Sequence, residues 1–113
     1  MFVILWHFEV KPGNLACFEK VYGPGGDWAQ LFRRHPGFRG TQLLHDPSRD
    51  SCYFTLDFWD SETARRDFLS AHQHAYDELD ASLQGLTLNE RHILSFELDP
   101  GVFSSRSPSA TSY

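Results

Sequence analysis

The stretch SCYFTLDFWDSETARRDFLSAHQHAYDELDASL, residues 51–83, contains a strand followed directly by a helix. Its first part, 51–59, is rich in aromatic residues, which is typical of a β-strand. Asp60 and Ser61 then provide a helix N-cap, and apolar residues recur three and four positions apart beyond them. The stretch therefore predicts a strand at 51–59 and an amphipathic helix at 62–83, closed by Gly85.

The segments on either side complete an alternating pattern of strands and helices. Three further strands and two helical pieces are predicted, at residues 2–10, 38–45 and 90–98 and at residues 15–22 and 28–34. The resulting order, β-α-β-β-α-β, is that of a ferredoxin-like α+β fold, in which a four-stranded antiparallel sheet carries both helices on one face. We expect one domain over residues 1–99 and a flexible Ser/Pro-rich tail over 100–113.

The composition indicates a single compact domain with a net negative charge. The chain has 113 residues, of which 41% are hydrophobic and 15% aromatic, enough for a core. The net charge of −5 argues against nucleic acid as a partner, because phosphate binding needs a concentrated basic patch. The longest apolar run, 2–6, is too short to span a membrane and does not resemble a secretory leader. A cytoplasmic chain with Cys17 and Cys52 reduced is therefore expected.

One face of the predicted sheet carries no helix. Alternation along the first and third strands assigns several apolar residues to this open face, among them Val3, Leu5, Tyr53 and Trp59. A face that met only water would show a cleaner alternation with polar residues. The face belongs either to a lone domain with a few exposed apolar side chains or to a homodimer whose second copy covers it. The homodimer is the favoured interpretation.

Two histidines are candidates for chemistry. His72 lies on the apolar stripe of the long helix, one turn from Phe68 and from Tyr76, and is either a hydrogen-bonded core residue or a base facing a cavity. His7 interrupts an apolar strand and needs a partner, for which Asp57 or Glu9 is expected. No cluster of His, Cys, Asp and Glu has the spacing of a metal site, so no metal is predicted.

Trp59 is predicted to share a cavity with His72, between the long helix and the sheet. The tryptophan ends its strand directly before the helix begins. Strict alternation places it on the open face, so this prediction requires a bulge or the strand end to turn its ring toward the helix.

The junction Trp59-Asp60-Ser61-Glu62-Thr63-Ala64 is similar to the Trp-x-Ser-x-x-Ala junction of the antibiotic biosynthesis monooxygenase superfamily. Residues 14–98, including the stretch YGPGGDWAQLFRRHPGFRGTQLL at 22–44, resemble a group of small bacterial members. The resemblance implies a dimeric α+β barrel, in which two sheets pack face to face and each subunit holds a cavity. Members oxidise polycyclic phenols to quinones with O₂ and no cofactor, or degrade haem.

The family's functional residues are matched only in part. Trp59 corresponds to the tryptophan that lines the cavity of quinone-forming members, whereas Thr55 and Arg65 stand where those enzymes have an asparagine and a tyrosine. His72 is similar in placement to the helix histidine that holds iron in haem-degrading relatives. Phe68 and His7 stand where those relatives have a tryptophan and an asparagine, and haem degradation is therefore not expected.

The resemblance implies a cofactor-independent monooxygenase that oxidises a small aromatic or polycyclic phenol with O₂. Its predicted catalytic residues are His72, Trp59 and His7, and its predicted substrate-binding residues are Trp6, Phe68 and Tyr76. The alternatives are a non-catalytic dimeric module that binds a small hydrophobic ligand and a haem-binding relative. The sequence leaves open whether the chain is a catalyst, what its substrate is, and what the glycine-rich segment 23–26 and the tail do.

Overall fold

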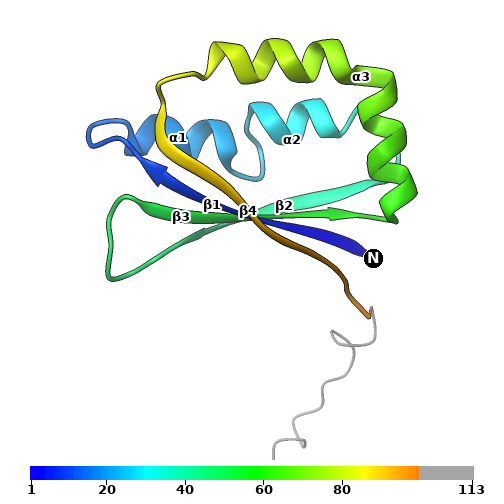
Figure 1. The fold of residues 1–113 in the computed structure, drawn as a ribbon, viewed down its shortest axis with the longest axis horizontal. Coiled ribbons are helices and arrows are strands. Elements are labelled where there is room, and N and C mark those ends of the chain that lie inside the picture. Colours follow the sequence, from blue (N-terminus) through cyan, green and yellow to red (C-terminus); the bar gives the residue numbers. More distant parts are fainter. Residues whose placement is uncertain (100–113) are drawn as a thin grey trace, which may run out of the picture.

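The computed structural model describes residues 1–99. Its elements are β1 (Phe2–Val10), α1 (Leu15–Tyr22), α2 (Asp27–Phe32), β2 (Phe38–His45), β3 (Cys52–Trp59), α3 (Glu62–Ser82) and β4 (Thr87–Glu97). The strands form one antiparallel sheet in the order β2-β3-β1-β4, and all three helices cover the same face (Figure 1). The predicted ferredoxin-like α+β fold is confirmed. The tail predicted for residues 100–113 lies outside the described residues.

Local chemistry explains where the helices begin and end. The Ser61 hydroxyl accepts a hydrogen bond from the Ala64 amide at 3.0 Å and so caps the start of α3. Gly85, at φ +90°, provides the left-handed backbone that follows the helix. Gly26 separates α1 from α2, and a side chain there would meet the carbonyl oxygen of Val21 at 2.2 Å. The glycine-rich segment therefore permits a close turn that no larger residue could make.

Helix α3 is not continuous. His72 has φ −128° and ψ 23°, which is outside the helical range, and the helix changes direction there (Figure 1). The first half contains the buried residues Ala64 and Phe68, whereas the second half has only partly buried residues on its inner side. The two halves are thus separate packing units.

Strand register corrects the predicted composition of the open face. Trp6 pairs with Thr55 and Leu5 with Leu56, so alternate residues of β3, including Trp59, point toward the helices together with Trp6. The placement of Tyr53 and Trp59 on the open face was therefore wrong. Alternation within each strand gave two sets of residues, but only the pairing of the strands shows which sets share a face. The β1–β3 pairing runs without a bulge, so Trp59 needs none to face α3.

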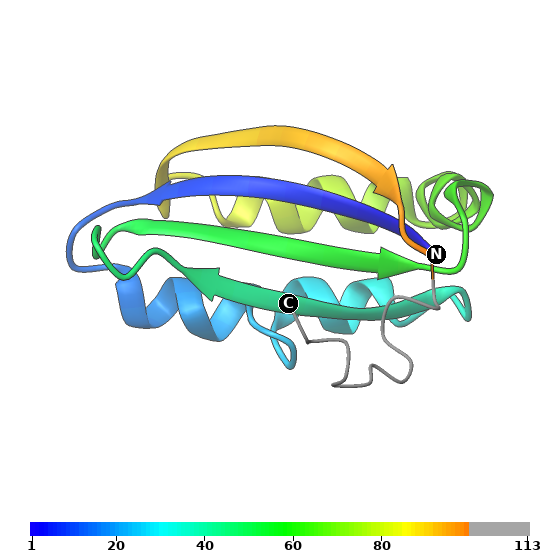
Figure 2. The ribbon, with the colours of Figure 1, turned by 90° about the horizontal axis from the view of Figure 1, so that it is seen from below.

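The open face, which no described helix covers (Figure 2), is more apolar than predicted. Paired positions of the four strands place the following residues on it: Val3, Leu5, Leu44, Phe54, Leu56, Phe58, Leu94 and Phe96. Leu44 and Leu94 are 41% and 44% exposed. The opposite face meets the helices through a core in which Trp59, Phe68 and Phe18 are completely buried.

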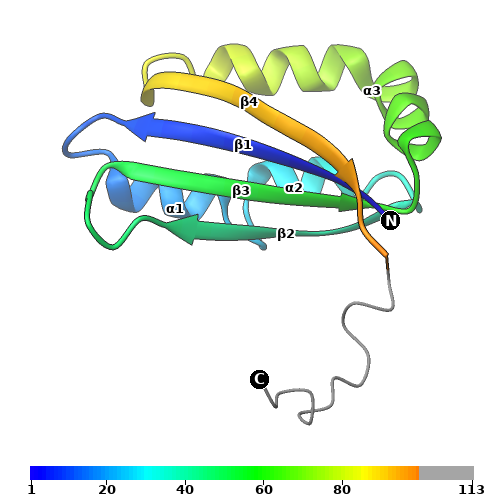
Figure 3. The ribbon, with the colours of Figure 1, turned by 60° about the horizontal axis from the view of Figure 1, so that its bottom comes forward.

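Strand β4 lies at the edge of the sheet beside β1 (Figure 3). It starts at Thr87, three residues before the predicted start, and nearly all of its residues are exposed. Its register with β1 shifts twice, between Leu5 and Trp6 and between Glu9 and Val10. Among the helices of residues 1–99, none is long and apolar enough to cross a membrane.

Candidate active site

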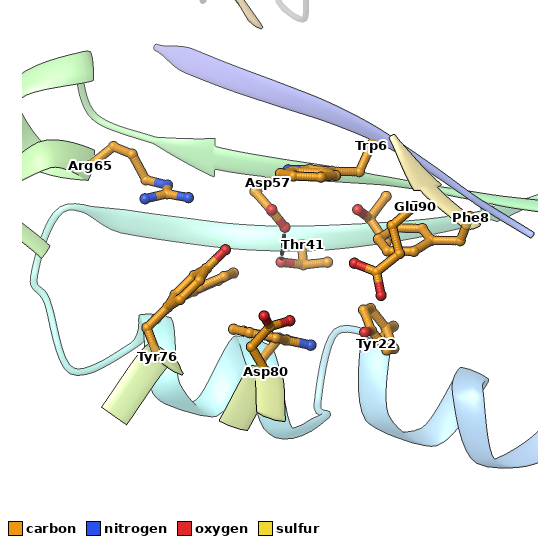
Figure 4. Close-up of a pocket in the computed structure, with 12 residues that line it drawn as sticks. Trp6, Phe8, Tyr22, Thr41, Asp57, Arg65, Tyr76, Asp80 and Glu90 are labelled. Carbon is orange, nitrogen blue, oxygen red and sulfur yellow. Dashed lines mark hydrogen bonds between the residues drawn. The ribbon is translucent and has the colours of Figure 1, made fainter. Parts of the chain in front are cut away.

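A pocket lies between the sheet and the helices (Figure 4). Its cavity has a volume of about 50 Å³ and is partly open to solvent. All four strands and all three helices contribute to its lining. The site is therefore assembled from segments that are far apart in the sequence.

Half of the lining is aromatic: Trp6, Phe8, Tyr22, Trp28, Phe32 and Tyr76. The Trp6 and Phe8 rings stack with their centroids 6.3 Å apart on the sheet side. On the helix side, the Trp28 and Tyr76 rings lie 4.9 Å apart. Flat apolar walls of this kind bind planar ligands and keep water away from them.

The buried carboxyl of Asp57 lies at the sheet side of the pocket. Asp57 is 8% exposed, and its Oδ1 atom accepts a hydrogen bond of 2.8 Å from the Thr41 hydroxyl. Burial raises the pKa of Asp57 to about 6, although the Thr41 hydrogen bond and the charge of Arg65 act in the opposite direction. The side chain makes no ion pair with any described residue. A carboxyl with this pKa can accept a proton at neutral pH, as a general base must.

Arg65 brings a positive charge to the same pocket. It extends from the first turns of α3, and its guanidinium carbon lies 5.7 Å from the ring centroid of Trp59 and 5.9 Å from that of Tyr76. Its Nε and Nη1 atoms are buried and have no hydrogen-bond partner among the described residues. Figure 4 shows the guanidinium and the Asp57 carboxyl on the same side of the pocket.

Two further carboxyls, of Asp80 on α3 and Glu90 on β4, lie near the Tyr22 hydroxyl at another part of the pocket (Figure 4). Burial and then the charge of Glu90 raise the pKa of Tyr22 above its ordinary range. Tyr22 therefore stays protonated at neutral pH and can donate a hydrogen bond. The lining is acidic overall, with Arg65 as its cationic member.

The structure places the predicted site residues in four groups, the last of which is His7 alone. Trp6 and Tyr76 line the pocket. Trp59 and Phe68 are completely buried with their rings 5.3 Å apart. They do not line the pocket but contact two residues that do, since Trp59 packs against Arg65 and Phe68 against Phe32. His72 is partly buried at the break in α3, with its ring 5.3 Å from that of Phe68, and is not among the lining residues. Catalytic roles for His72 and Trp59 stay predictions.

His7 lies on the opposite side of the sheet from the pocket. Its partner is neither of the carboxylates expected from the sequence, because its Nε2 atom lies 3.0 Å from the Cys52 sulfur. Phe54, its paired neighbour on β3, contacts the imidazole ring edge-on at 4.9 Å. Any function of His7 would therefore act on the open face rather than in the pocket.

Sequence reasoning did not single out Asp57 or Arg65 as functional residues. A signal for Asp57 was present, since it interrupts a helix-facing row that includes Tyr53 and Trp59. Arg65 follows the buried Ala64 and borders the apolar stripe of α3. The positions of both residues indicate a site only when the faces of the sheet are assigned correctly.

Comparisons with known proteins agree with this architecture. Residues 1–79 match the sequence profile described as antibiotic biosynthesis monooxygenase. A variant of SnoaB, a cofactor-independent oxygenase from Streptomyces nogalater, is 25% identical, with a TM-score of 0.67 over 86% of this chain and 91% of that one. A candidate antibiotic biosynthesis monooxygenase from Deinococcus radiodurans is 18% identical, with a TM-score of 0.66 over 88% and 93% of the two chains.

A variant of MhuD with two manganese protoporphyrin IX groups bound per active site shares the fold as well. It is 24% identical, with a TM-score of 0.60 over 87% of this chain and 94% of that one. No curated protein matches the sequence.

Proposed function

Because the chain belongs to the antibiotic biosynthesis monooxygenase family, we propose that it is a cofactor-independent monooxygenase. Its substrate is a small planar phenol, bound in the pocket between the sheet and the helices. The observation that carries the proposal is the placement of one buried carboxyl, Asp57, in a pocket walled by aromatic rings. The similarity to SnoaB, a cofactor-independent oxygenase, supports the same reaction class.

The chemistry begins with proton removal. Asp57 accepts the phenolic proton, and the electron-rich anion that results can give electrons to O₂. One oxygen atom of O₂ enters the ring and the other leaves as water, so the product is a quinone that has gained one oxygen and lost two hydrogens. The aromatic walls exclude water from this anion and hold its ring in place.

Oxygen uptake with a naphthol-type phenol tests this proposal. We expect enzyme-dependent consumption of O₂, with one labelled oxygen atom in the quinone when isotopically labelled O₂ is supplied. Label from water in place of O₂, or an uptake no faster than that without protein, would contradict it. Tight binding of the phenol without any uptake would instead identify a non-catalytic binding module.

We also propose that the functional unit is a homodimer that buries the open face. Eight apolar residues from all four strands share this face, and no described helix covers it. A contiguous apolar face of this kind marks an interaction surface in soluble proteins. A second copy of the same face is complementary in polarity and gives a closed two-fold assembly.

Haem does not fit this pocket. None of the lining residues is a histidine, the side chain that most often holds haem iron. His72 lies at the break in α3, outside the lining. We therefore predict no haem degradation. Incubation with haem and a reductant should leave the Soret absorbance in place, and loss of this band with new bilin absorbance would show that the prediction is wrong.

A further inference from the structure

Taking the proposed oxygenase function as the premise, we propose that Arg65 receives the substrate oxygen once its proton has left. The pocket thereby selects neutral planar phenols over aromatic carboxylates. Arg65 is in this reading a catalytic residue, because its guanidinium contacts the reacting oxygen. The inference rests on the unmet donors of Arg65, on its position relative to Asp57, and on the charges of the lining.

The first observation is that Arg65 has buried donors without acceptors. Its Nε and Nη1 atoms are shielded from solvent, yet neither has a hydrogen-bond partner among the described residues. Such groups are rare in folded proteins, because a buried donor normally finds an acceptor. A guanidinium keeps its charge under all ordinary conditions, so the need for an acceptor cannot be removed by deprotonation. An anionic oxygen of a ligand could accept hydrogen bonds from these Arg65 donors.

The second observation is that Arg65 is held in place by rings rather than by a counterion. The guanidinium carbon lies 5.7 Å and 5.9 Å from the ring centroids of Trp59 and Tyr76. These contacts, together with a side-chain hydrogen bond to Tyr76, orient the cation, and its Nε and Nη1 atoms still have no acceptor among the described residues. Other arginines of the chain differ in this respect, since Arg39 is bound to Asp60 and Arg49 to Glu9.

The third observation is the separation of Arg65 from Asp57. Both side chains line the pocket and lie on the same side of it (Figure 4), but they form no ion pair with each other. A hydroxyl bound between them could donate to the Asp57 carboxylate and accept from Arg65. When the O–H bond breaks, the proton forms a new O–H bond on Asp57, and the electron pair stays on the substrate oxygen beside the guanidinium.

The charges of the lining favour a ligand that enters neutral. The lining holds the carboxyls of Asp57, Asp80 and Glu90 and the guanidinium of Arg65. Transfer of a proton from a neutral phenol to Asp57 leaves the total charge of the pocket unchanged. An aromatic carboxylate would instead add a negative charge to a lining that already has more acidic than basic groups. Like charges held together in a pocket of low polarity repel strongly.

Binding of para-nitrophenol tests the proposal without any turnover, because its anion and its neutral form have different absorption spectra. We expect the bound form to contain at least about tenfold more anion relative to neutral phenol than the free form at the same pH, equivalent to one pKa unit of the ligand. Arg65→Gln should lose this shift, and Arg65→Lys should keep part of it. Arg66→Gln is the matched control, since Arg66 is exposed on the same helix. Thermal melts establish that each variant is folded.

The proposal is overturned if Arg65→Gln leaves the bound anion fraction unchanged, if para-nitrophenol does not bind, or if para-nitrobenzoate binds as tightly as para-nitrophenol. Should Arg65→Gln fail to fold, the comparison of Arg65→Lys with the unmodified protein gives the same readout. An Arg65-dependent shift together with no oxygen uptake from any phenol would support the role of Arg65 and refute the oxygenase function. The two proposals can therefore fail separately.

Discussion

Replacement of Asp57 by Asn is expected to lower the rate of oxygen uptake by about a hundredfold or more. A positioned general base contributes about 10²–10⁴-fold to catalysis, and an amide cannot accept the phenolic proton. Asn has nearly the same volume as Asp, and its side-chain oxygen can still accept the hydrogen bond from Thr41. The loss should therefore appear in the rate and not in the fold.

The same replacement should make the protein more stable above about pH 6. The pKa of Asp57 is raised from 3.8 to about 6 by burial, so the folded state holds this proton more tightly than the unfolded state. The contribution of the neutral carboxyl is fully present below about pH 4 and is lost as the pH rises through about 6. Above that range, ionisation of the buried group costs up to about 3 kcal/mol. In urea unfolding, the free energy of unfolding of Asp57→Asn should rise relative to that of the unmodified protein between about pH 4 and pH 8.

Two further variants separate this role from others. Asp67→Asn changes an exposed carboxylate on α3, outside the pocket lining, and should leave both rate and stability unchanged. His72→Ala removes the base predicted from the sequence, and it should retain oxygen uptake if Asp57 is the base. If Asp57→Asn keeps its rate of oxygen uptake and a folded His72→Ala variant loses it, His72 and not Asp57 is the general base.

Sedimentation of the chain at micromolar concentration should give about twice the mass of 13.0 kDa. We expect Leu94→Asp to give a monomer, because it places a charge on the apolar open face beside Leu5. Leu94 is 44% exposed in the isolated chain, so this change spares the subunit fold. Val3 would be a poorer choice, since it is 1% exposed and its replacement would damage the subunit itself.

Leu88→Asp is the matched control for the dimer. Leu88 is on the same strand and 61% exposed, but it lies beside Leu83 and Gln84 at the turn after α3. This variant should sediment as the unmodified protein does. A monomeric unmodified chain, or a Leu94→Asp variant that stays dimeric, would exclude the open face as the interface.

The fold could be predicted from the sequence because its signals are local. The Ser61 cap, the helical spacing of α3 and the glycine that closes it, Gly85, each act within a few residues, and the structure contains the elements they predict. The bounds of β4 were less accurate, since its bulges against β1 arise from pairing between distant segments.

The site could not be predicted to the same extent, because it depends on strand register. The pairing of Trp6 with Thr55 decides that Asp57 and Trp59 face the helices, and no residue within β3 encodes that pairing. With the faces assigned the other way, Asp57 was placed on the open face as an expected partner of His7. Trp6 and Tyr76 were nevertheless identified as large aromatic residues, whereas Phe68, selected on the same ground, is buried in the core.

The break in α3 gives the pocket a mechanical property. Arg65 belongs to the half of the helix that is fixed to the core by Phe68, whereas Tyr76 and Asp80 belong to the half beyond His72. Arg65 and Asp80, the cationic and acidic residues that α3 contributes to the pocket, therefore lie on two helical segments that meet at His72. The distance between these groups depends on the backbone angles of His72, so a change in the bend of the helix would change the width of the site.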